Sequence, residues 1–247
     1  MRFLLQPLAQ TFLGLFYPNA CAACGCSLWQ ECETHLQLCA HCKETLPQMS
    51  PPYCAICCEP FYGEISAPFE CSNCAGIHFA FEAAVCPYKS AGAVREIVHR
   101  FKYLREIHLR QTLAAFLNDA FHDERLNAVP FDYIVPVPLH HVRLRTREFN
   151  QAELLAHALG KKRGIPVNAC LRRVRYTTTQ TQLSRTERQN NIKGAFCVKK
   201  RALSSIAGKN FLLLDDVLTT GSTLGECARV LKEAGARCVW AIAVARG

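Results

Sequence analysis

The stretch FLLLDDVLTTGSTLGE, residues 211–226, passes from an apolar run through two carboxylates into a loop of hydroxyl residues around one glycine. Four successive apolar residues suit a strand covered on both faces, as in parallel sheets. The residues after the loop have helical spacing, so the stretch reads as strand, turn and helix. Asp215 and Asp216 then have two interpretations: they solubilise the end of a strand, or they belong to a binding site.

Strand and helix patterns alternate from residue 79 onward. Strands are expected at residues 79–88, 131–139, 210–216 and 238–245, and helices at 93–104, 109–122, 150–164 and 222–236. This alternation predicts an α/β fold with a doubly wound, mostly parallel sheet. In such sheets ligands bind beyond the carboxyl ends of the strands, where the acid pair stands.

Cysteine and charge divide the chain into two parts. Eleven of the 16 cysteines lie between Cys21 and Cys74. Residues 1–88 hold two basic and seven acidic residues, a net charge of −5. The remaining residues carry a net charge of +14, which gives the whole chain +9. We therefore expect two domains: an N-terminal helix with a cysteine-rich double zinc ribbon at residues 1–78, and an α/β domain at 79–247. The basic body suits a polyanionic partner or a phosphate-rich ligand, or is simply a solvated basic surface.

Four C-x-x-C pairs follow one another in the cysteine-rich head. Each pair can aim two sulfurs at one point, and two pairs complete a tetrahedral thiolate site for Zn²⁺. A disulfide scaffold fits poorly because no secretory signal is visible, and a thiol-redox module rests on the C-x-x-C spacing alone. Two structural zinc ions are expected, with sequential or interleaved pairing left open. Nearby residues that could substitute, although none is needed, are Cys26, Cys32, Cys58, His35 and His41. The predicted ligands are Cys21, Cys24, Cys39, Cys42, Cys54, Cys57, Cys71 and Cys74.

No stretch approaches the roughly 18 uncharged apolar residues of a bilayer-spanning helix. The apolar residues near the N-terminus recur at helical spacing and are interrupted by polar residues, which indicates a short helix packed on the body. A cytoplasmic protein without a membrane span is therefore expected.

The loop after the acid pair has the chemistry of a phosphate site. Backbone N–H groups and hydroxyls at the start of a helix can hold a phosphate, here at Thr219, Thr220, Gly221, Ser222 and Thr223. The two carboxylates can accept hydrogen bonds from a diol or hold Mg²⁺. Three arginines follow the strand at 131–139, at positions 143, 145 and 147, and suit a second anionic group. Phosphate, diol and second anion together describe a ribose 5-phosphate carrying a pyrophosphate.

Residues 211–223 resemble the phosphoribosyl-pyrophosphate signature of type I phosphoribosyltransferases. The wider pattern resembles the ComF family of bacterial competence proteins, in which a zinc ribbon precedes a phosphoribosyltransferase-like domain. The stretches that carry it are RFKYL (100–104), VPVPLHHVRLRTREFNQAELLA (135–156) and TTTQTQLSRTERQNNIKGAF (177–196). Together with the cysteine pairs, the resemblance covers nearly the whole chain.

The resemblance implies a role for each of these segments. Asp215 and Asp216 would bind the ribose hydroxyls with Mg²⁺, and residues 219–223 the 5-phosphate. The pyrophosphate loop would comprise Leu139, His140, Arg143 and Arg147, and the flexible loop over the site would include Thr177, Gln180 and Arg188. Possible contacts to DNA or phosphate are Lys102, Arg145, Arg172, Arg173 and Arg175. Glu148 replaces the glycine expected in RGFNQ, which places a carboxylate near an anionic leaving group.

Two functions are consistent with this pattern. The first is a competence protein that handles internalised single-stranded DNA during uptake or utilisation, binds phosphoribosyl pyrophosphate or a related phosphosugar, and works with other DNA-uptake or recombination proteins. Phe101, Tyr103, Phe149 and Tyr176 each stand near basic residues and could stack bases, or could pack within their own elements. The second is an active phosphoribosyltransferase of nucleotide metabolism with an unidentified acceptor, although no general base or nucleobase pocket is recognisable.

Overall fold

A parallel sheet forms the centre of the computed structural model, which describes residues 20–28, 36–65, 67–176 and 191–247. The strand order is β1–β7–β6–β3, and β2 continues beside β7 beyond β1. The strands are β1 (Ala84–Val85), β2 (Tyr88–Lys89), β3 (Tyr133–Pro136), β6 (Asn210–Leu218) and β7 (Cys238–Arg246). A separate antiparallel pair consists of β4 (Leu171–Arg173) and β5 (Phe196–Val198).

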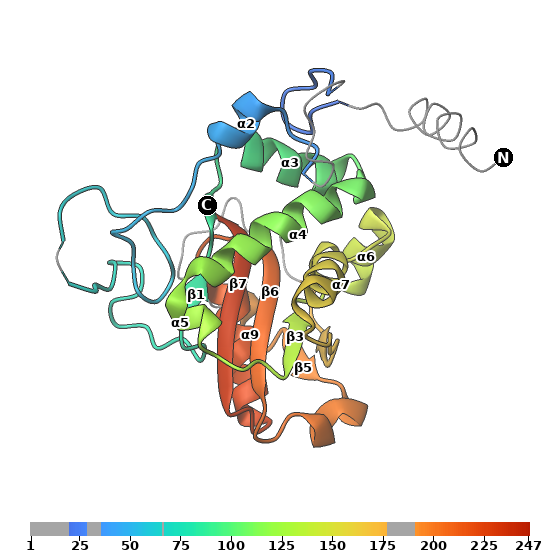
Figure 1. The fold of residues 1–247 in the computed structure, drawn as a ribbon. Coiled ribbons are helices and arrows are strands. Elements are labelled where there is room, and N and C mark those ends of the chain that lie inside the picture. The colour runs from blue at the N-terminus through green and yellow to red at the C-terminus, as the bar shows by residue number, and fades with distance from the viewer. Residues whose placement is uncertain (1–19, 29–35, 66, 177–190) are drawn as a thin grey trace.

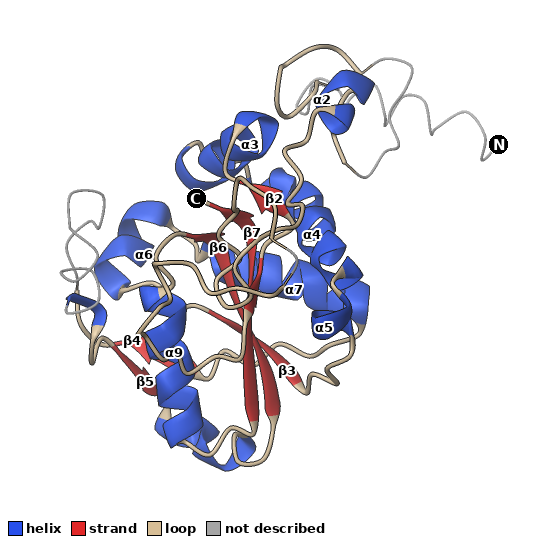
Figure 2. Ribbon diagram, turned by 90° about the vertical axis from the view of Figure 1, so that its left-hand side faces the viewer, coloured by secondary structure: helices blue, strands red, loops and turns tan. Residues whose placement is uncertain are grey.

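Helices cover both faces of this sheet (Figures 1 and 2). On one face, α4 (Arg110–Asp119) packs on α7 (Gln151–Arg163); on the other, α9 (Ser222–Glu233) contacts β5, β6 and β7. α3 (Gly92–Tyr103) lies against α4, and α6 (His141–Arg147) follows β3. The short helices are α2 (Ala40–Glu44), α5 (Glu124–Asn127) and the 3₁₀ turns Ile107–Leu109, Ala120–His122 and Lys200–Ser205. The predicted doubly wound α/β fold is confirmed.

The apolar runs of β6 and β7 form the middle of the core. Residues 211–214 are fully buried, as are Val239 and residues 241–245, because each strand has a neighbour on both sides and helices above and below. Burial of one such aliphatic side chain stabilises the fold by about 1.5–3 kcal/mol. This is the physical reason why uninterrupted apolar runs predicted parallel strands here.

The structure corrects three local predictions. β6 does not end at the acid pair, as the strand predicted at 210–216 does, but continues for two more residues to Leu218. The arginine segment expected as a loop is helix α6. Only residues 84–85 and 88–89 of the predicted strand at 79–88 pair with β7. The expected N-terminal helix lies outside the described residues.

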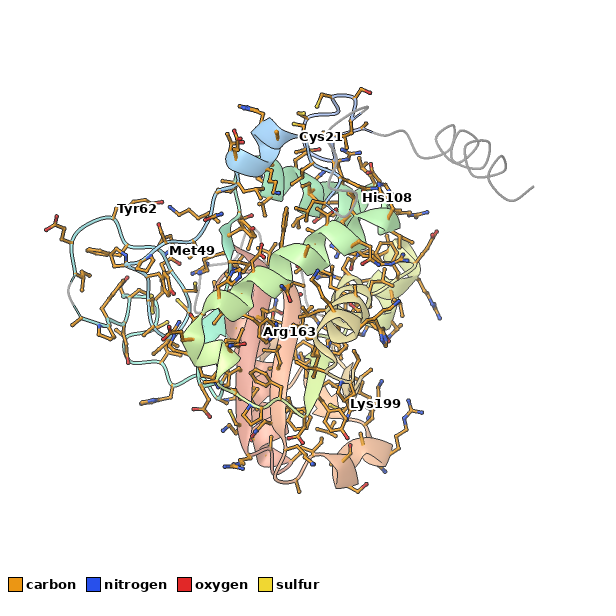
Figure 3. All side chains as sticks on the ribbon, viewed as in Figure 1. Cys21, Met49, Tyr62, His108, Arg163 and Lys199 are labelled. Carbon is orange, nitrogen blue, oxygen red and sulfur yellow. The ribbon has the colours of Figure 1, made fainter. Side chains whose placement is uncertain are left out.

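The cysteine-rich head packs directly on the α/β body. Buried head residues, among them Cys21, Leu38 and Cys58, belong to the same continuous core as the sheet. Figure 3 shows Cys21 beside α3, whereas Tyr62 lies in a separate loop region of the head. The domain boundary at residue 78 therefore stays a prediction. Within the described ranges, no helix has the length and apolar character to span a bilayer.

Candidate functional site

A cavity of about 200 Å³ opens at the carboxyl ends of β3 and β6. Four parts of the chain line it: the end of β6 with the start of α9, the segment from Val137 through α6 to α7, Lys102 of α3, and Arg173 of β4. Of the predicted site residues, those that line it are Lys102, Leu139, Arg143, Arg147, Arg173, Asp215, Asp216, Thr219, Thr220, Gly221, Ser222 and Thr223. The fold thus brings both strand-end motifs into one site.

The two acids reach the cavity from opposite faces of β6, because successive side chains of a strand alternate. Asp216 is buried and its Oδ1 lies 2.8 Å from the ammonium of Lys102. Asp215 accepts a hydrogen bond from the backbone N–H of Asp216 at 2.9 Å. Lys102, predicted as a contact to DNA or phosphate, therefore pairs with an acid inside the cavity.

Burial and the neighbouring Asp216 carboxylate raise the pKa of Asp215 to about 7. Lys102 and Arg173 act in the opposite direction, which limits this rise. Burial lowers the pKa of Lys102, but the charges of Asp216 and Asp215 outweigh it and leave that pKa raised. Lys102 therefore stays a cation, while Asp215 changes its charge close to neutral pH.

Residues 219–223 turn the chain from β6 into α9. Gly221 caps the helix with a φ of +76°, a left-handed conformation that glycine adopts without steric cost. The hydroxyls of Thr220 and Ser222 lie 2.9 Å apart. Gly221 offers no side-chain acceptor, and the N–H of Ser222 makes only a long contact of 3.5 Å with the hydroxyl of Thr220. The first N–H groups of α9, beside the cavity, can therefore donate to an anion.

Arginines from α6 border the opposite side of the cavity. Arg143 lies 5.8 Å from the ring of Tyr176, and Arg147 lies 5.3 Å from the ring of Tyr103. Both tyrosines are about half exposed, at 50% for Tyr176 and 59% for Tyr103. Each arginine therefore lies between the cavity and an exposed aromatic ring.

The remaining predicted residues lie elsewhere or outside the described ranges. His140 is buried and accepts a hydrogen bond from the N–H of Val142, which caps α6 instead of lining the cavity. Arg145, Arg172 and Arg175 are exposed and do not line it. Arg172 donates to the sulfur of Cys197, and Arg175 to backbone carbonyls at 191 and 193. Thr177, Gln180 and Arg188 lie outside the described residues.

Glu148 points away from the cavity. It is 62% exposed and pairs with Arg105 at 2.7 Å. Its φ of +68° at the end of α6 is the left-handed conformation that a glycine would adopt freely. The expected conflict with an anionic ligand is therefore absent, and the substitution affects the backbone instead.

Two lining residues were missed as ligand contacts. Asn150 donates its amide to the carbonyl of Val137, which ties α7 to the end of β3. Gln151 is 1% exposed, and its Oε1 accepts from Arg147 at 3.3 Å. Because arginine can only donate, this bond orients the amide, and the Nε2 of Gln151 finds no acceptor among the described residues. The signal available in the sequence was the pair of amide side chains, Asn150 and Gln151, at the start of the predicted helix and directly after the arginine cluster.

The second cysteine cluster consists of Cys54, Cys57, Cys71 and Cys74, whose sulfurs lie within 4.8 Å of one another. Cys57 and Cys71 are 3.6 Å apart, close to the roughly 3.8 Å expected between thiolates around one zinc. Pairing is therefore sequential and not interleaved. The cysteines of the described ranges are free thiols, which disfavours the disulfide scaffold.

In the first cluster the mutually close set is Cys21, Cys24, Cys26 and Cys39. Cys26 thus joins three of the four predicted ligands, because a turn with Gly25 at φ +76° folds the chain back and brings the carbonyl of Cys26 to the N–H of Cys21. The thiol of Cys42, the fourth predicted ligand, also interacts with those of Cys21, Cys24 and Cys39. Cys42 borders the set, with its N–H donating to the sulfur of Cys39 at 3.4 Å. Each cluster can hold one zinc ion.

Comparison with known proteins agrees with this geometry. The sequence model of the phosphoribosyl transferase domain family matches residues 150–247 of this chain. The chain is 32% identical over 213 residues to Competence protein F of Haemophilus influenzae, covering 83% of this chain and 90% of the relative. It is 31% identical over 217 residues to the DNA utilization protein YhgH of Salmonella typhi, covering 82% and 93%.

Among solved structures, a glutamine phosphoribosylpyrophosphate amidotransferase from B. subtilis, complexed with ADP and GMP, matches 59% of this chain and 30% of its own. The sequence identity is 20% and the TM-score 0.38.

Proposed function

The chain belongs to the ComF family, that of Competence protein F, and on this premise we propose that it acts in the uptake or utilisation of DNA. In this role it binds phosphoribosyl pyrophosphate, or a related phosphosugar, with Mg²⁺ in the cavity, and it handles internalised single-stranded DNA. The observation that carries the proposal is the cavity itself, in which an acid pair and a helix N-terminus face two arginines.

Each part of such a ligand has a matching group in the cavity. The N–H groups and hydroxyls of residues 219–223 suit a 5-phosphate, and the carboxylates suit a diol or Mg²⁺. Arg143 and Arg147 suit a pyrophosphate. The Nε2 of Gln151 is a buried donor that needs an acceptor, which an anionic oxygen would supply. An apolar ligand would leave these donors without acceptors, so the cavity suits an anionic ligand.

Calorimetric titration of phosphoribosyl pyrophosphate with Mg²⁺ tests this part. We expect saturable binding that the double variant Asp215→Ala and Asp216→Ala abolishes. The matched control is Asp132→Ala, because Asp132 precedes β3 at the opposite end of the sheet. Ribose 5-phosphate, which lacks the pyrophosphate, serves as a second probe. If it binds more weakly, the difference in affinity is due to the contacts between the pyrophosphate and the arginines. Equal binding by the double variant and the wild type would refute the site.

The proposed path for single-stranded DNA runs over Tyr103 and Tyr176. Exposed aromatic rings beside arginines stack bases without sequence preference, at about 1–3 kcal/mol per base. Phe101 is fully buried and Phe149 partly so, against the core, so these two are packed side chains and not stacking platforms. Each tyrosine ring lies beside an arginine that lines the cavity, so bases stacked on these rings would lie next to the phosphosugar site.

Fluorescence anisotropy with a labelled oligothymidine tests the DNA part. We expect binding that weakens steeply with salt, and binding weaker by about thirtyfold or more for Tyr103→Ala plus Tyr176→Ala. Tyr62→Ala is the matched control: Tyr62 is 83% exposed and has Lys89 at 5.2 Å from its ring, but it lies in the acidic head. Unchanged binding by the double variant would contradict the assigned path.

An active transferase is the second candidate, favoured by one observation. A carboxyl group with a pKa of about 7 can accept a proton at neutral pH, and Asp215 has that property inside the cavity. The reaction would displace pyrophosphate from ribose C1, with the arginines stabilising the departing anion. Release of pyrophosphate that depends on an added nucleobase would support this candidate over a binding role.

A further inference from the structure

Three consecutive carbonyls of the second cysteine cluster are bound by the α/β body. The carbonyl of Ala55 accepts from Arg125 at 3.1 Å, and that of Ile56 from the N–H of Ala84 in β1 at 2.8 Å. The carbonyl of Cys57 accepts from Nε of Arg246 at 3.1 Å. The turn that carries two of the four thiols is therefore held by α5, β1 and β7 of the body.

Arg246 extends this connection to the end of β6. The side chain is buried, and its Nη1 donates to the carbonyl of Leu218 at 3.1 Å. Its Nη2 pairs with Glu59, just beyond the cysteine turn. Leu218 is the last residue of β6 and directly precedes the 219–223 loop. One guanidinium thus joins the cysteine cluster to the point where the loop begins.

Phe79 makes a second, independent connection. Its ring packs against the cluster of Cys54, Cys57 and Cys74, and it stacks on Phe81 at 4.8 Å. A Cβ atom at Gly225 would lie 2.8 Å from this ring, and one at Gly221 would lie 3.3 Å from it. The loop and the first turn of α9 therefore rest on Phe79, and only glycines allow an approach this close.

The first cluster contacts other elements. The carbonyl of Ala22 accepts from Arg100 of α3, and the carbonyl of Leu36 accepts from the hydroxyl of Thr112 in α4. Among the described residues, the contacts that connect the head to Leu218, Gly221 and Gly225 come from the second cluster and its flanking residues. The first cluster therefore contacts α3 and α4, whereas the second cluster contacts the end of β6 and the start of α9.

We infer that Arg246 and Phe79 are positioning residues through which the metal-bound second cluster holds the 219–223 loop in its phosphate-binding shape. A bound metal fixes four thiols to one point and so fixes the turn whose carbonyl Arg246 contacts. When the metal leaves, both connections loosen and the loop opens more often, so a phosphate ligand must order it on binding. Zinc occupancy of this cluster thereby regulates the site. The consequence for ligand affinity rests on the proposed function, whereas the coupling does not.

Hydrogen exchange of the ligand-free protein tests the coupling directly. Cys71→Ser, in the second cluster, should reduce zinc content from two ions to one and speed exchange of the 219–226 amides about tenfold. Cys39→Ser, in the first cluster, should also lose one zinc and leave these amides unchanged. Amides of α7 serve as an internal reference for global unfolding. Equal loop exchange in Cys71→Ser and wild type, or an equal rise in both variants, would overturn the inference.

A second variant pair separates positioning from folding of the head. Phe79→Leu should keep two zinc ions and still speed exchange of the 219–226 amides. Phe61→Leu is its matched control, because Phe61 is 43% exposed and packs on Phe69 of the same segment. Titration of phosphoribosyl pyrophosphate is measured separately. Absence of wild-type binding would refute the proposed function while leaving the exchange result intact.

Discussion

The ammonium of Lys102 lies 2.8 Å from Oδ1 of Asp216, and both side chains are largely buried, at 17% and 12% exposure. Lys102 belongs to α3 and Asp216 to β6, so the pair links one covering helix to the strand that carries the acid pair. In the absence of a ligand the lysine supplies the counter-charge for two adjacent carboxylates. A phosphate ligand would compete with Asp216 for this ammonium.

Replacing Lys102 with Met should destabilise the protein by about 3 kcal/mol, because removal of one partner leaves a buried charge uncompensated. Chemical denaturation measures this change. The matched control is Lys209→Met, which breaks the exposed pair with Asp132 at 3.0 Å and should cost about 1 kcal/mol or less. Similar losses for the two variants would show that the Lys102 pair is no stronger than a surface pair.

The stability and the ligand affinity should depend on pH in opposite directions through Asp215. Its pKa is raised in the folded protein from 3.8 to about 7, so the folded state binds the proton more tightly than the unfolded chain does. The resulting stabilisation is present below pH 3.8, decreases as the pH rises, and is gone above about pH 7. Ligand binding, which needs the carboxylate, should strengthen as the pH rises through about 7.

Denaturation across this pH range, compared with Asp215→Asn, measures the stability part. The unfolding free energy of the wild type should fall relative to that of Asp215→Asn as the pH rises from acid to neutral, because only the wild type has a carboxyl group that loses its proton there. A difference independent of pH would contradict the raised pKa.

Glu148→Gly should be more stable than Glu148→Ala by about 1 kcal/mol, because only glycine adopts a φ of +68° without strain. Both variants lose the exposed pair with Arg105, so their difference isolates the backbone. Thermal unfolding provides the comparison. Neither variant should alter ligand affinity, since the carboxylate lies outside the cavity.

Gln151→Leu should weaken binding of phosphoribosyl pyrophosphate about tenfold, the loss expected for one hydrogen bond to a charged group. Its stability should change little, because the loss of the 3.3 Å bond from Arg147 is offset by removal of a buried donor that has no acceptor among the described residues. Gln151→Glu is the complementary variant and should bind more weakly still, since a carboxylate would face an anion. Unaltered affinity in both would place Gln151 outside the ligand contacts.

Gly225→Ala should destabilise the protein by about 1 kcal/mol. In most helices this substitution stabilises by about that amount, but here the new Cβ would lie 2.8 Å from the ring of Phe79, and overpacking costs about 1–3 kcal/mol. In a Phe79→Ala background the sign should reverse. A double-mutant cycle of unfolding free energies measures this, and additive effects would contradict the contact.

Much of the fold could be predicted because its signals are local. Residues 211–214 are apolar without interruption and form a strand buried on both faces, and the spacing of 93–104 gave α3. Segments whose structure depends on distant partners were predicted less well. β6 continues past the acid pair because Val217 and Leu218 pair with β7, and this pairing is not visible in the two residues themselves.

The sequence by itself determined the parallel α/β fold, the acid pair with its hydroxyl loop, and the cysteine pairs, since each depends on residues close together in the chain. Only the tertiary structure decided that Lys102 neutralises Asp216, that Cys26 joins the first cluster, and that Arg246 and Phe79 join the second cluster to the loop. Such contacts arise where separate elements pack together, and their distances depend on the whole core.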